Sequence, residues 1–506
     1  MARPDLLAAV DLGSNSFHLQ VGRVVDGQIY ALDSLREVVR LGGGLTSEKR
    51  IDRATQARAL ETLEKFGERL RGLPRNAVRA VGTNALRVAK NAPQFLRDAR
   101  AALGFPIEVI AGREEARLIY LGVAHSTPPA PQRPPYKRLV VDIGGGSTEF
   151  IIGRGLEPLL TESLYMGCVS FSLAYFPDGK VEKSRMKKAE LAARQELSGM
   201  VREYRAEGWE EAIGSSGTAR ALETILHENG LAEEGITREG LDRLRSLLIK
   251  HERADPGRIA GLRKDRAPVL PGGVAIMLST MEELGIERMA VSEGALRHGV
   301  LYDLLGRVQH KDMREATVAQ FMRRYHIDAA QAERVRLLAL KIFDSLETKE
   351  DAESDRALLD WAARLAEVGL SVAHAQYHKH SAYILQNADM PGFSRMEQQR
   401  LARIVLAQRG KLAKVQDEGL EGSDWALVFA LRIAALALRS RTDAKLPLMR
   451  VAGDEAGYAI DLPQSWLEDN PLTASALETE SEHWKSVGMR LDVNALSEKK
   501  VAQLRG

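Results

Sequence analysis

The period of the hydrophobic positions changes along the first 125 residues. A short buried run and then strict alternation predict three consecutive antiparallel strands, after which helical and strand-like stretches follow in turn. The expected strands are residues 7–10, 16–24, 30–39, 77–81 and 106–110, and the expected helices are residues 52–70, 86–103 and 113–121. This order predicts an α/β domain with a mixed sheet.

The same order begins again after a segment rich in proline. Five prolines fall between residues 128 and 135, and they predict a loop because proline fixes φ and lacks an N–H donor. Strands are then expected at residues 138–142, 149–153 and 159–164, and helices from Lys187, Thr218 and Arg238. Each half thus opens with a strand, a tight loop after an aspartate, and a return strand. We therefore predict a duplicated α/β architecture in which the two loops face each other.

Strand signals fade after residue 311. Asp328, followed three residues later by Gln331, is typical of the start of a helix, and further helical stretches follow. Alternation returns only near the C-terminus. The predicted domains are residues 1–125 and 126–310, both α/β, residues 311–447, all-α, and residues 448–506, a small α/β cap.

Composition and charge narrow the class of protein. Hydrophobic residues make up 44% of the chain and charged residues 28%, which indicates globular domains. The formal net charge is only +2, so nucleic acid is not an expected partner and any polyanion must bind local basic patches. We expect the single cysteine, Cys168, to be a small core residue. One cysteine cannot form an intramolecular disulfide bond, which is consistent with a reducing cytoplasm. The longest apolar stretch, residues 425–438, is too short to span a bilayer, so we expect a cytoplasmic protein with at most peripheral contact with the inner face of the membrane.

Two loops carry the chemistry that the sequence suggests. They are residues 11–16 and 142–149, and each begins with an aspartate at the end of a strand. The small residues that follow expose amides and hydroxyls that can surround a phosphate, and glycine lets the backbone approach the anion. Two ordinary hairpins are the less favoured alternative, because the aspartate recurs in matching halves. A third glycine loop, residues 214–218, precedes a helix and could bind an anion, but by itself it is better explained as a capped helix start.

Five sequence blocks together resemble the exopolyphosphatase/guanosine pentaphosphatase family, which belongs to the sugar kinase–actin–heat-shock ATPase superfamily. The blocks are residues 11–18, 81–87, 113–119, 142–149 and 292–297. The resemblance continues through residues 391–393 to the C-terminal cap, as in the long bacterial exopolyphosphatases. It implies two actin-like (ribonuclease H-like) domains, release of terminal orthophosphate from inorganic polyphosphate, and a homodimer.

The candidate site residues come from these loops and blocks. Glu115 matches the family's catalytic base, which would orient and deprotonate the attacking water. The residues expected to hold phosphate are Ser14, Asn15, Arg87, Gly144, Gly145, Gly146, Ser147, Thr148, Gly214 and Ser216. The carboxylates of Asp11, Asp142 and Glu149 are hard oxygen ligands suited to Mg²⁺, the expected cofactor. The ordinary alternatives are a helix-terminal acid for Glu115, a surface ion pair for Arg87 and an outward strand position for Glu149.

The helical domain resembles a degenerate phosphohydrolase domain of the type named for a metal-binding His–Asp pair. Ala366 stands where a ligand histidine would stand, so no metal is expected there. A long polyphosphate would still need basic side chains away from the cleavage site. Candidates for such a channel are Lys187, Lys188, Lys379, Arg409, Lys411 and Lys414, each equally explained as a solvated helix residue. The α/β halves hold every proposed catalytic residue, so residues 1–310 are expected to hydrolyse short polyphosphates alone.

An exopolyphosphatase is therefore the preferred function, with three alternatives. A guanosine pentaphosphate 5′-phosphohydrolase would share the same loops. A sugar or acetate kinase of the superfamily is less favoured, because Glu115 supplies a base for water and no sugar-binding motif is recognised. A non-catalytic polyphosphate sensor is disfavoured by the intact Glu115, Asp142 and Arg87.

Overall fold

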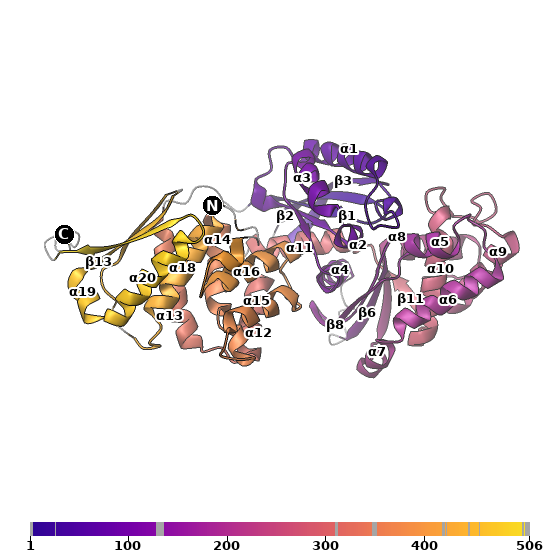
Figure 1. Ribbon diagram of the computed structural model, residues 1–506. Coiled ribbons are helices and arrows are strands. Elements are labelled where there is room, and N and C mark those ends of the chain that lie inside the picture. The colour runs from indigo at the N-terminus through magenta and orange to yellow at the C-terminus, as the bar shows by residue number, and fades with distance from the viewer. Residues whose placement is uncertain are drawn as a thin grey trace. The chain divides into compact units, whose positions relative to one another are not determined.

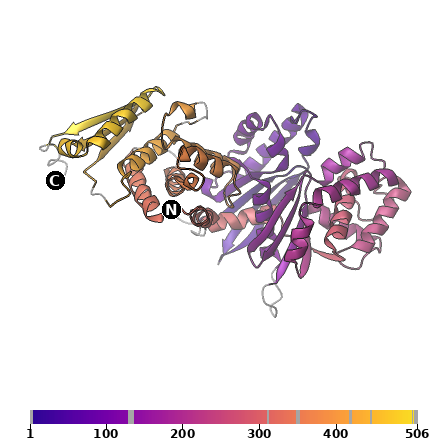
Figure 2. The same ribbon diagram turned by 60° about the horizontal axis from the view of Figure 1, so that its bottom comes forward.

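The structure is a computed structural model, and it divides the chain into two compact units (Figures 1 and 2). It describes residues 4–25, 27–127, 136–308, 312–346, 352–416, 420, 422–443, 446–454, 456–497 and 500. The first unit is Met1–Met313 with Pro391–Ser394, and the second is Arg314–Met390 with Arg395–Gly506. The predicted proline-rich loop, residues 128–135, lies outside the described residues.

The first unit opens with a five-stranded sheet of order β3-β2-β1-β4-β5. Its strands are β1 (Leu6–Leu12), β2 (Phe17–Val25), β3 (Gln28–Glu37), β4 (Val78–Gly82) and β5 (Ile107–Val109), and its helices are α1 (Arg53–Leu70), α2 (Asn84–Val88), α3 (Ala92–Leu103) and α4 (Gly112–Ser126). The three predicted antiparallel strands are confirmed. The single helix expected over residues 86–103 is instead two helices. Between them the Asn91 side chain bonds both the N–H and the C=O of Ile51, and Pro93 sits in the first turn of α3, where a missing N–H costs nothing.

A second sheet, of order β10-β11-β9-β6-β7-β8, repeats this plan. Its strands are β6 (Lys137–Ile143), β7 (Thr148–Arg154), β8 (Glu157–Leu164), β9 (Glu211–Ser215), β10 (Ile236–Thr237) and β11 (Arg288–Val291). Its helices are α5 (Cys168–Tyr175), α6 (Lys183–Leu197), α7 (Val201–Glu207), α8 (Ser216–Glu228), α9 (Arg238–His251), α10 (Leu270–Leu284) and α11 (Leu296–Val308). β6 pairs antiparallel with β7 and parallel with β9, as β1 pairs with β2 and β4. The predicted duplication is confirmed.

Three hydrophobic clusters hold the first unit together. One lies within each half, and the third is shared between the halves. In the shared cluster α4 packs against α11 and against β7 and β8, while α11 packs against β1. Leu7 and Val81 from the first sheet and Val140 from the second are fully buried there. This common core fixes the two strand-end loops opposite each other.

The second unit combines helices with a small sheet. Its helices are α12 (Met313–Arg324), α13 (Ala329–Asp344), α14 (Ala352–Leu365), α15 (Tyr377–Asn387), α16 (Arg395–Ala407), α17 (Ala413–Gln416), α18 (Asp424–Ala437), α19 (Gln464–Asp469) and α20 (Pro471–Lys485). Its strands are β12 (Arg450–Asp454), β13 (Gly457–Pro463) and β14 (Arg490–Leu496). The Asp328 side chain accepts the N–H of Gln331 at 3.0 Å, as expected for the start of α13. Trp484 of α20 is fully buried beside Phe429 and Tyr458, which ties the helices to the sheet.

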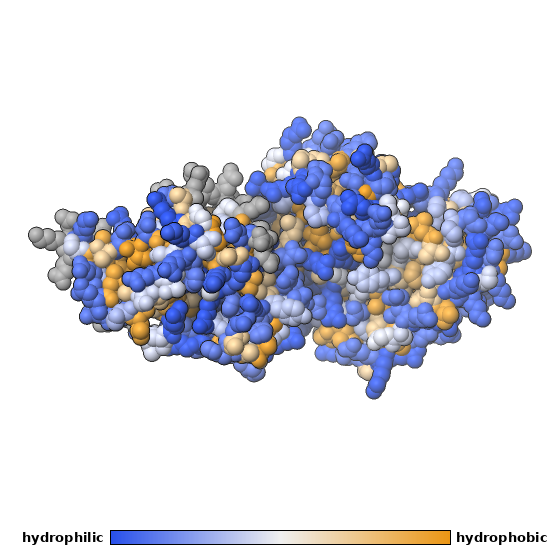
Figure 3. All heavy atoms as spheres, viewed as in Figure 1, coloured by the Kyte–Doolittle hydropathy of each residue, from blue (hydrophilic) through white to orange (hydrophobic). Residues whose placement is uncertain are grey.

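The longest apolar run of the sequence forms α18, which is buried as predicted. Its one charged interior residue, Arg432, is buried and bonded to Glu480 of α20. Among the described residues no helix is long and apolar enough to cross a membrane. On the face shown in Figure 3, hydrophilic side chains cover most of the surface and apolar ones appear in small groups.

Candidate functional site

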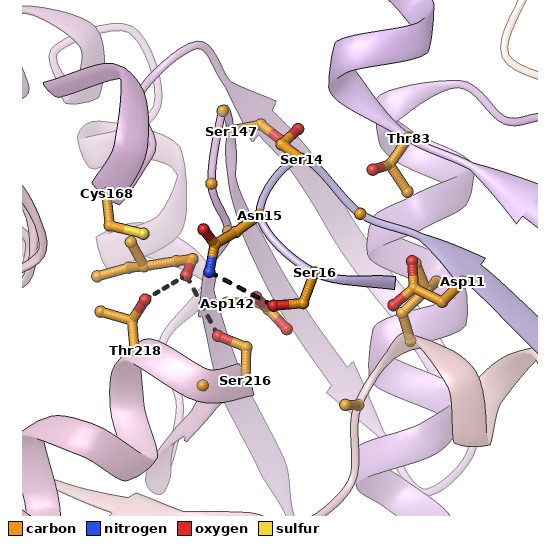
Figure 4. Close-up of a pocket in the computed structure, with 18 of the residues that line it drawn as sticks. Asp11, Ser14, Asn15, Ser16, Thr83, Asp142, Ser147, Cys168, Ser216 and Thr218 are labelled. Atoms are coloured by element: carbon orange, nitrogen blue, oxygen red, sulfur yellow. Dashed lines mark hydrogen bonds between the residues drawn. The ribbon is translucent and has the colours of Figure 1, made fainter. Parts of the chain in front are cut away.

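The two predicted loops meet at a pocket of about 110 Å³ in the first unit (Figure 4). A Cβ on Gly145 would lie 3.0 Å from the Cβ of Ser14, and one on Gly146 would lie 2.5 Å from Oδ1 of Asn84. Only glycine therefore lets the second loop approach the first half this closely. The predicted residues that line the pocket are Asp11, Ser14, Asn15, Glu115, Asp142, Gly144, Gly145, Gly146, Ser147 and Ser216.

Four of the residues predicted to hold phosphate or metal do not line this pocket. Thr148 donates its hydroxyl hydrogen to the carbonyl of Met166 at 2.6 Å, and Gly214 is buried within β9. Glu149 is 1% exposed and accepts the Ser163 hydroxyl at 2.8 Å, so the outward strand position considered for it is wrong. The fourth is Arg87, which contacts Glu115 instead.

Glu115 lies in the first turn of α4, where it lines the pocket and is held by Arg87. Nη1 of Arg87 donates to Oε2 of Glu115 at 2.6 Å and to the carbonyl of Ile110 at 3.1 Å. The two side chains of the pair are 7% and 9% exposed, so this is not a surface ion pair. The guanidinium group fixes the direction in which the Glu115 carboxylate faces, which a catalytic base requires.

The carboxylates around the pocket are costly to ionise together. Burial, with the neighbouring charges of Glu115 and Asp142, raises the pKa of Asp11 to about 8, although Arg297 acts in the opposite direction. Burial likewise raises the pKa of Asp142 to about 6, and it raises the pKa of Glu149 well above its ordinary value. Oδ1 of Asp11 is buried and has no hydrogen-bond partner among the residues that the structure describes. This is the electrostatic pattern of a site completed by a cation.

Mg²⁺ fits two of the three carboxylates predicted to hold it. Asp11 and Asp142 line the pocket, whereas Glu149 does not. Within the described part of the chain, no three His, Cys, Asp or Glu side chains are grouped so that they could hold a metal ion. Mg²⁺ commonly binds through one or two carboxylates and completes its shell with water and phosphate oxygens. The pocket thus suits an ion that arrives with a phosphate substrate, and Mg²⁺ stays a prediction.

Three arginines that the sequence analysis did not select also line the pocket: Arg220, Arg266 and Arg297. Nε of Arg297 donates to Oε1 of Gln20 at 2.9 Å, and Nη1 of Arg220 lies 3.9 Å from Oε2 of Glu293. Two of them could have been found from the sequence. Arg297 ends the last of the five family-like blocks, and Arg220 follows closely after the third glycine loop, on the helix that this loop precedes. Arg266 could not have been found in this way, because it follows a stretch without periodicity.

These arginines add positive charge to the lining of the pocket. Burial, together with Arg297, lowers the pKa of His18 to about 3, so this pocket residue is neutral. A Cβ on Gly217 would lie 2.0 Å from Nη2 of Arg266, so the third glycine loop provides the space for that guanidinium group. The pocket therefore brings fixed cations, loop amides and carboxylates together around a small volume.

Glu114, next to Glu115, anchors the start of α4 in a buried network. Nε of Arg117 donates to Oε2 of Glu114 at 2.8 Å, and its Nη2 donates to Oδ1 of Asp303 at 2.5 Å. The N–H of Gly392 also donates to Oε2 of Glu114, at 3.0 Å. Gly392 belongs to the first unit although it comes from a distant part of the sequence. Residues 1–310, expected to hydrolyse alone, therefore lack a direct partner of the helix that carries Glu115.

The basic residues proposed for a polyphosphate channel lie in both units. Lys187 and Lys188 are exposed on α6 and do not line the pocket. In the second unit Lys379, Arg409 and Lys411 are exposed, whereas Lys414 is half-buried and donates to the carbonyl of Arg409. Burial, with Arg432 and Lys379, lowers the pKa of Lys414 to about 7. Lys379, Arg409 and Lys414 are thus neighbours, and their role as a channel stays a prediction.

Comparisons with known proteins match the chain to one family. A model of the Ppx/GppA phosphatase family matches residues 20–308, and a model of domain III of the Ppx/GppA phosphatases matches residues 313–481. The solved structure of the Aquifex aeolicus member of the Ppx/GppA family is 25% identical, covers 60% of this chain and 98% of its own, and superposes with a TM-score of 0.50. An exopolyphosphatase from Cytophaga hutchinsonii is 26% identical over 60% of this chain and 98% of its own, with a TM-score of 0.53.

Proposed function

The chain belongs to the Ppx/GppA phosphatase family, and on that premise we propose that it hydrolyses the terminal phosphoanhydride bond of inorganic polyphosphate. The resemblance of its sequence blocks to this family is confirmed, and so is the fold that the resemblance implied. One observation carries the proposal: glycine-loop amides and three arginines surround a pocket that also contains Glu115. Similarity to a protein described as an exopolyphosphatase supports polyphosphate as the substrate. A homodimer stays a prediction.

The pocket is suited to the end of a phosphate chain. Drug-sized ligands occupy roughly 300–1,000 Å³, whereas this pocket measures about 110 Å³ and so accepts one terminal group. Residues 144–147 and Ser14 line it. The N–H of Gly144 donates to the carbonyl of Ser147 at 2.9 Å, so the amides of residues 145–147 and the hydroxyl of Ser14 are the groups that can donate to phosphate oxygens. Arg220 and Arg297 can fork onto the same oxygens and offset their charge. The rest of the chain would extend out of the pocket.

Glu115 supplies the chemistry at that end. Its carboxylate, held by Arg87, would orient a water molecule opposite the leaving oxygen and accept its proton. The water oxygen bonds to the terminal phosphorus as the bridging P–O bond breaks, and the electron pair of that bond leaves on the shortened chain. The products are orthophosphate and a polyphosphate one unit shorter. When bound at Asp11 and Asp142, Mg²⁺ would offset negative charge on the phosphate oxygens.

The test is orthophosphate release from two substrates by the purified full-length protein with Mg²⁺. We expect a higher kcat/KM for long-chain polyphosphate than for guanosine pentaphosphate. The reverse order would favour the alternative function, and no orthophosphate from either substrate would overturn hydrolysis. Glu115→Gln is assayed in parallel, because phosphate release that it does not reduce would come from a contaminating phosphatase.

A further inference from the structure

A second pocket, of about 770 Å³, lies within the second unit. Helices α13, α14 and α18 and the C-terminal helix α20 all contribute to its lining. Ala366, at the position of a ligand histidine in the His–Asp type of domain, is part of the wall. The volume falls in the range of about 300–1,000 Å³ that is typical of small-molecule sites.

Arginine dominates the charge of this pocket. Its lining includes five arginines, namely Arg364, Arg409, Arg432, Arg439 and Arg441, and two glutamates, Glu367 and Glu480. Both glutamates are already paired: Nη2 of Arg432 donates to Glu480 at 2.7 Å, and Arg441 bonds to Glu367. Arg409 and Arg439 are exposed and have no acidic partner among the described residues. Two guanidinium groups are therefore left for an external anion.

Further basic side chains lie beside Arg409, which lines the pocket. The guanidinium group of Arg409 lies 5.5 Å from the ring centre of Tyr377, another lining residue, in a cation–π contact that leaves its charge in place. Lys414 bonds to the carbonyl of Arg409, and burial, with Arg432 and Lys379, lowers the pKa of Lys414 to about 7. Burial, with Lys414 and Arg409, lowers the pKa of the adjacent His378 to about 4. Such a region attracts anions.

Apolar residues also contribute to the lining of the pocket, which distinguishes it from a site for polyphosphate alone. Its apolar lining residues are Ile327, Ala332, Val335, Ala363, Ala366, Leu370, Ala435, Leu436 and Ala476. A bare phosphate chain has no apolar group that could be buried against these residues. A ligand that uses the whole pocket needs both an anionic group and an apolar or aromatic body.

We propose that this pocket binds a small organic phosphate, with its phosphate at Arg409 and Arg439 and its apolar or aromatic body on the alanine- and leucine-rich wall. Arg409, a candidate for the polyphosphate channel, then serves a different ligand. This proposal does not depend on the proposed hydrolysis.

Titration calorimetry of the full-length protein in chelator tests it with three probes. ATP has both a phosphate group and an aromatic body, adenosine has only the body, and tripolyphosphate has only the anion. We expect saturable ATP binding at least about tenfold tighter than that of adenosine, since hydrogen bonds to charged groups contribute most. The double variant Arg409→Ala/Arg439→Ala should weaken ATP binding about tenfold or more. Ala435→Phe, which fills the pocket, should abolish it, and the matched surface change Arg450→Ala should leave it unchanged.

Three outcomes would overturn the proposal. One is no ATP binding by the wild type. Another is ATP binding that the double arginine variant leaves intact, which would place the ATP in the first pocket. The third is tripolyphosphate binding as tightly as ATP through the same two arginines, which would make the pocket part of a polyphosphate channel. If Ala435→Phe does not fold, the two exposed arginines still decide the result.

Discussion

The pockets of the two units both gather arginines, but they treat their acids differently. In the first unit Asp11 keeps a buried oxygen without a partner, and burial with neighbouring carboxylates raises its pKa. In the second unit Glu367 and Glu480 are both bonded to arginine. A buried carboxylate oxygen without a partner costs stability, so its retention at Asp11 points to a cation site. The arginine partner of Glu115 instead orients a carboxylate that faces the first pocket, and the arginine partners of Glu367 and Glu480 compensate the charge of acids in the second. The difference separates a pocket built for reaction from one built for binding.

The largest effect is expected from Glu115→Gln. Glutamine keeps the shape of the side chain and can still accept the Arg87 hydrogen bond, but it cannot take a proton from water. Turnover of polyphosphate should fall by about 10²–10⁴-fold while binding is nearly unchanged. The measurement is kcat from orthophosphate release, with Glu162→Gln, a half-buried acid paired with Arg113 outside the pocket, as the matched control. Turnover near that of the wild type would remove Glu115 from the mechanism.

Substitutions of two arginines in the first unit should distinguish a residue that positions Glu115 from a residue that binds the substrate. Arg87→Ala releases the Glu115 carboxylate, so kcat should fall by about 10–100-fold with little change in KM. Arg297→Ala removes a cation that lines the pocket, so KM should rise about tenfold. Steady-state kinetics on short polyphosphate check both, with Arg450→Ala as a surface control. If Arg87→Ala changed only KM, Arg87 would bind substrate directly.

A smaller effect is expected at Gly392, which has φ of 88°. Alanine at this position should lower the free energy of unfolding by about 1–2 kcal/mol, because φ is positive, and it should displace the N–H that donates to Glu114. We expect kcat to fall several-fold, because Glu114 precedes Glu115 at the start of α4. Gly104→Ala is the matched control, since Gly104 has φ of 81° and nothing within 4 Å of an added Cβ. Equal kcat values in the two variants would show that residues 391–394 do not influence the site.

The smallest effect is a pH dependence of stability without metal. The pKa of Asp11 is about 8 in the folded protein against an ordinary value of 3.8, so between about pH 4 and pH 8 the folded state binds more protons than the unfolded state. Stability should therefore fall as pH rises through this window. The Asp11→Asn variant should lose less stability over this window, so its Tm should fall by roughly 2–4 °C less than the Tm of the wild type. Scanning calorimetry in chelator measures it, and adding Mg²⁺ should raise Tm more at pH 8 than at pH 5. Identical pH profiles for wild type and variant would contradict the raised pKa.

Much of the first unit could be predicted because its signals are local. The strand–loop–strand pattern after Asp11 recurs after Asp142, and the observed sheets repeat it. α10 was not found because nearly all of its first three turns are buried, leaving no polar stripe, and because Pro271 and two glycines at its start read as a turn.

The rest depends on contacts between distant residues. Arg266 reaches the pocket from a segment without periodicity, and Gly392 reaches Glu114 across 278 positions. Arg87 was selected as a phosphate ligand because its block matched the family, but only the fold reveals that its guanidinium group bonds to Glu115. Residue type and local spacing identify groups with the right chemistry, and packing decides which of them share a pocket.

The central claim is that Glu115 delivers water to the terminal phosphorus within the first unit's pocket. The direct measurement is hydrolysis of polyphosphate in H₂¹⁸O, with mass analysis of the orthophosphate released at early times. The account predicts that each new orthophosphate carries one oxygen from the solvent, and that Glu115→Gln suppresses the labelled product. Orthophosphate without solvent oxygen, or labelled product formed equally fast by Glu115→Gln, would contradict it.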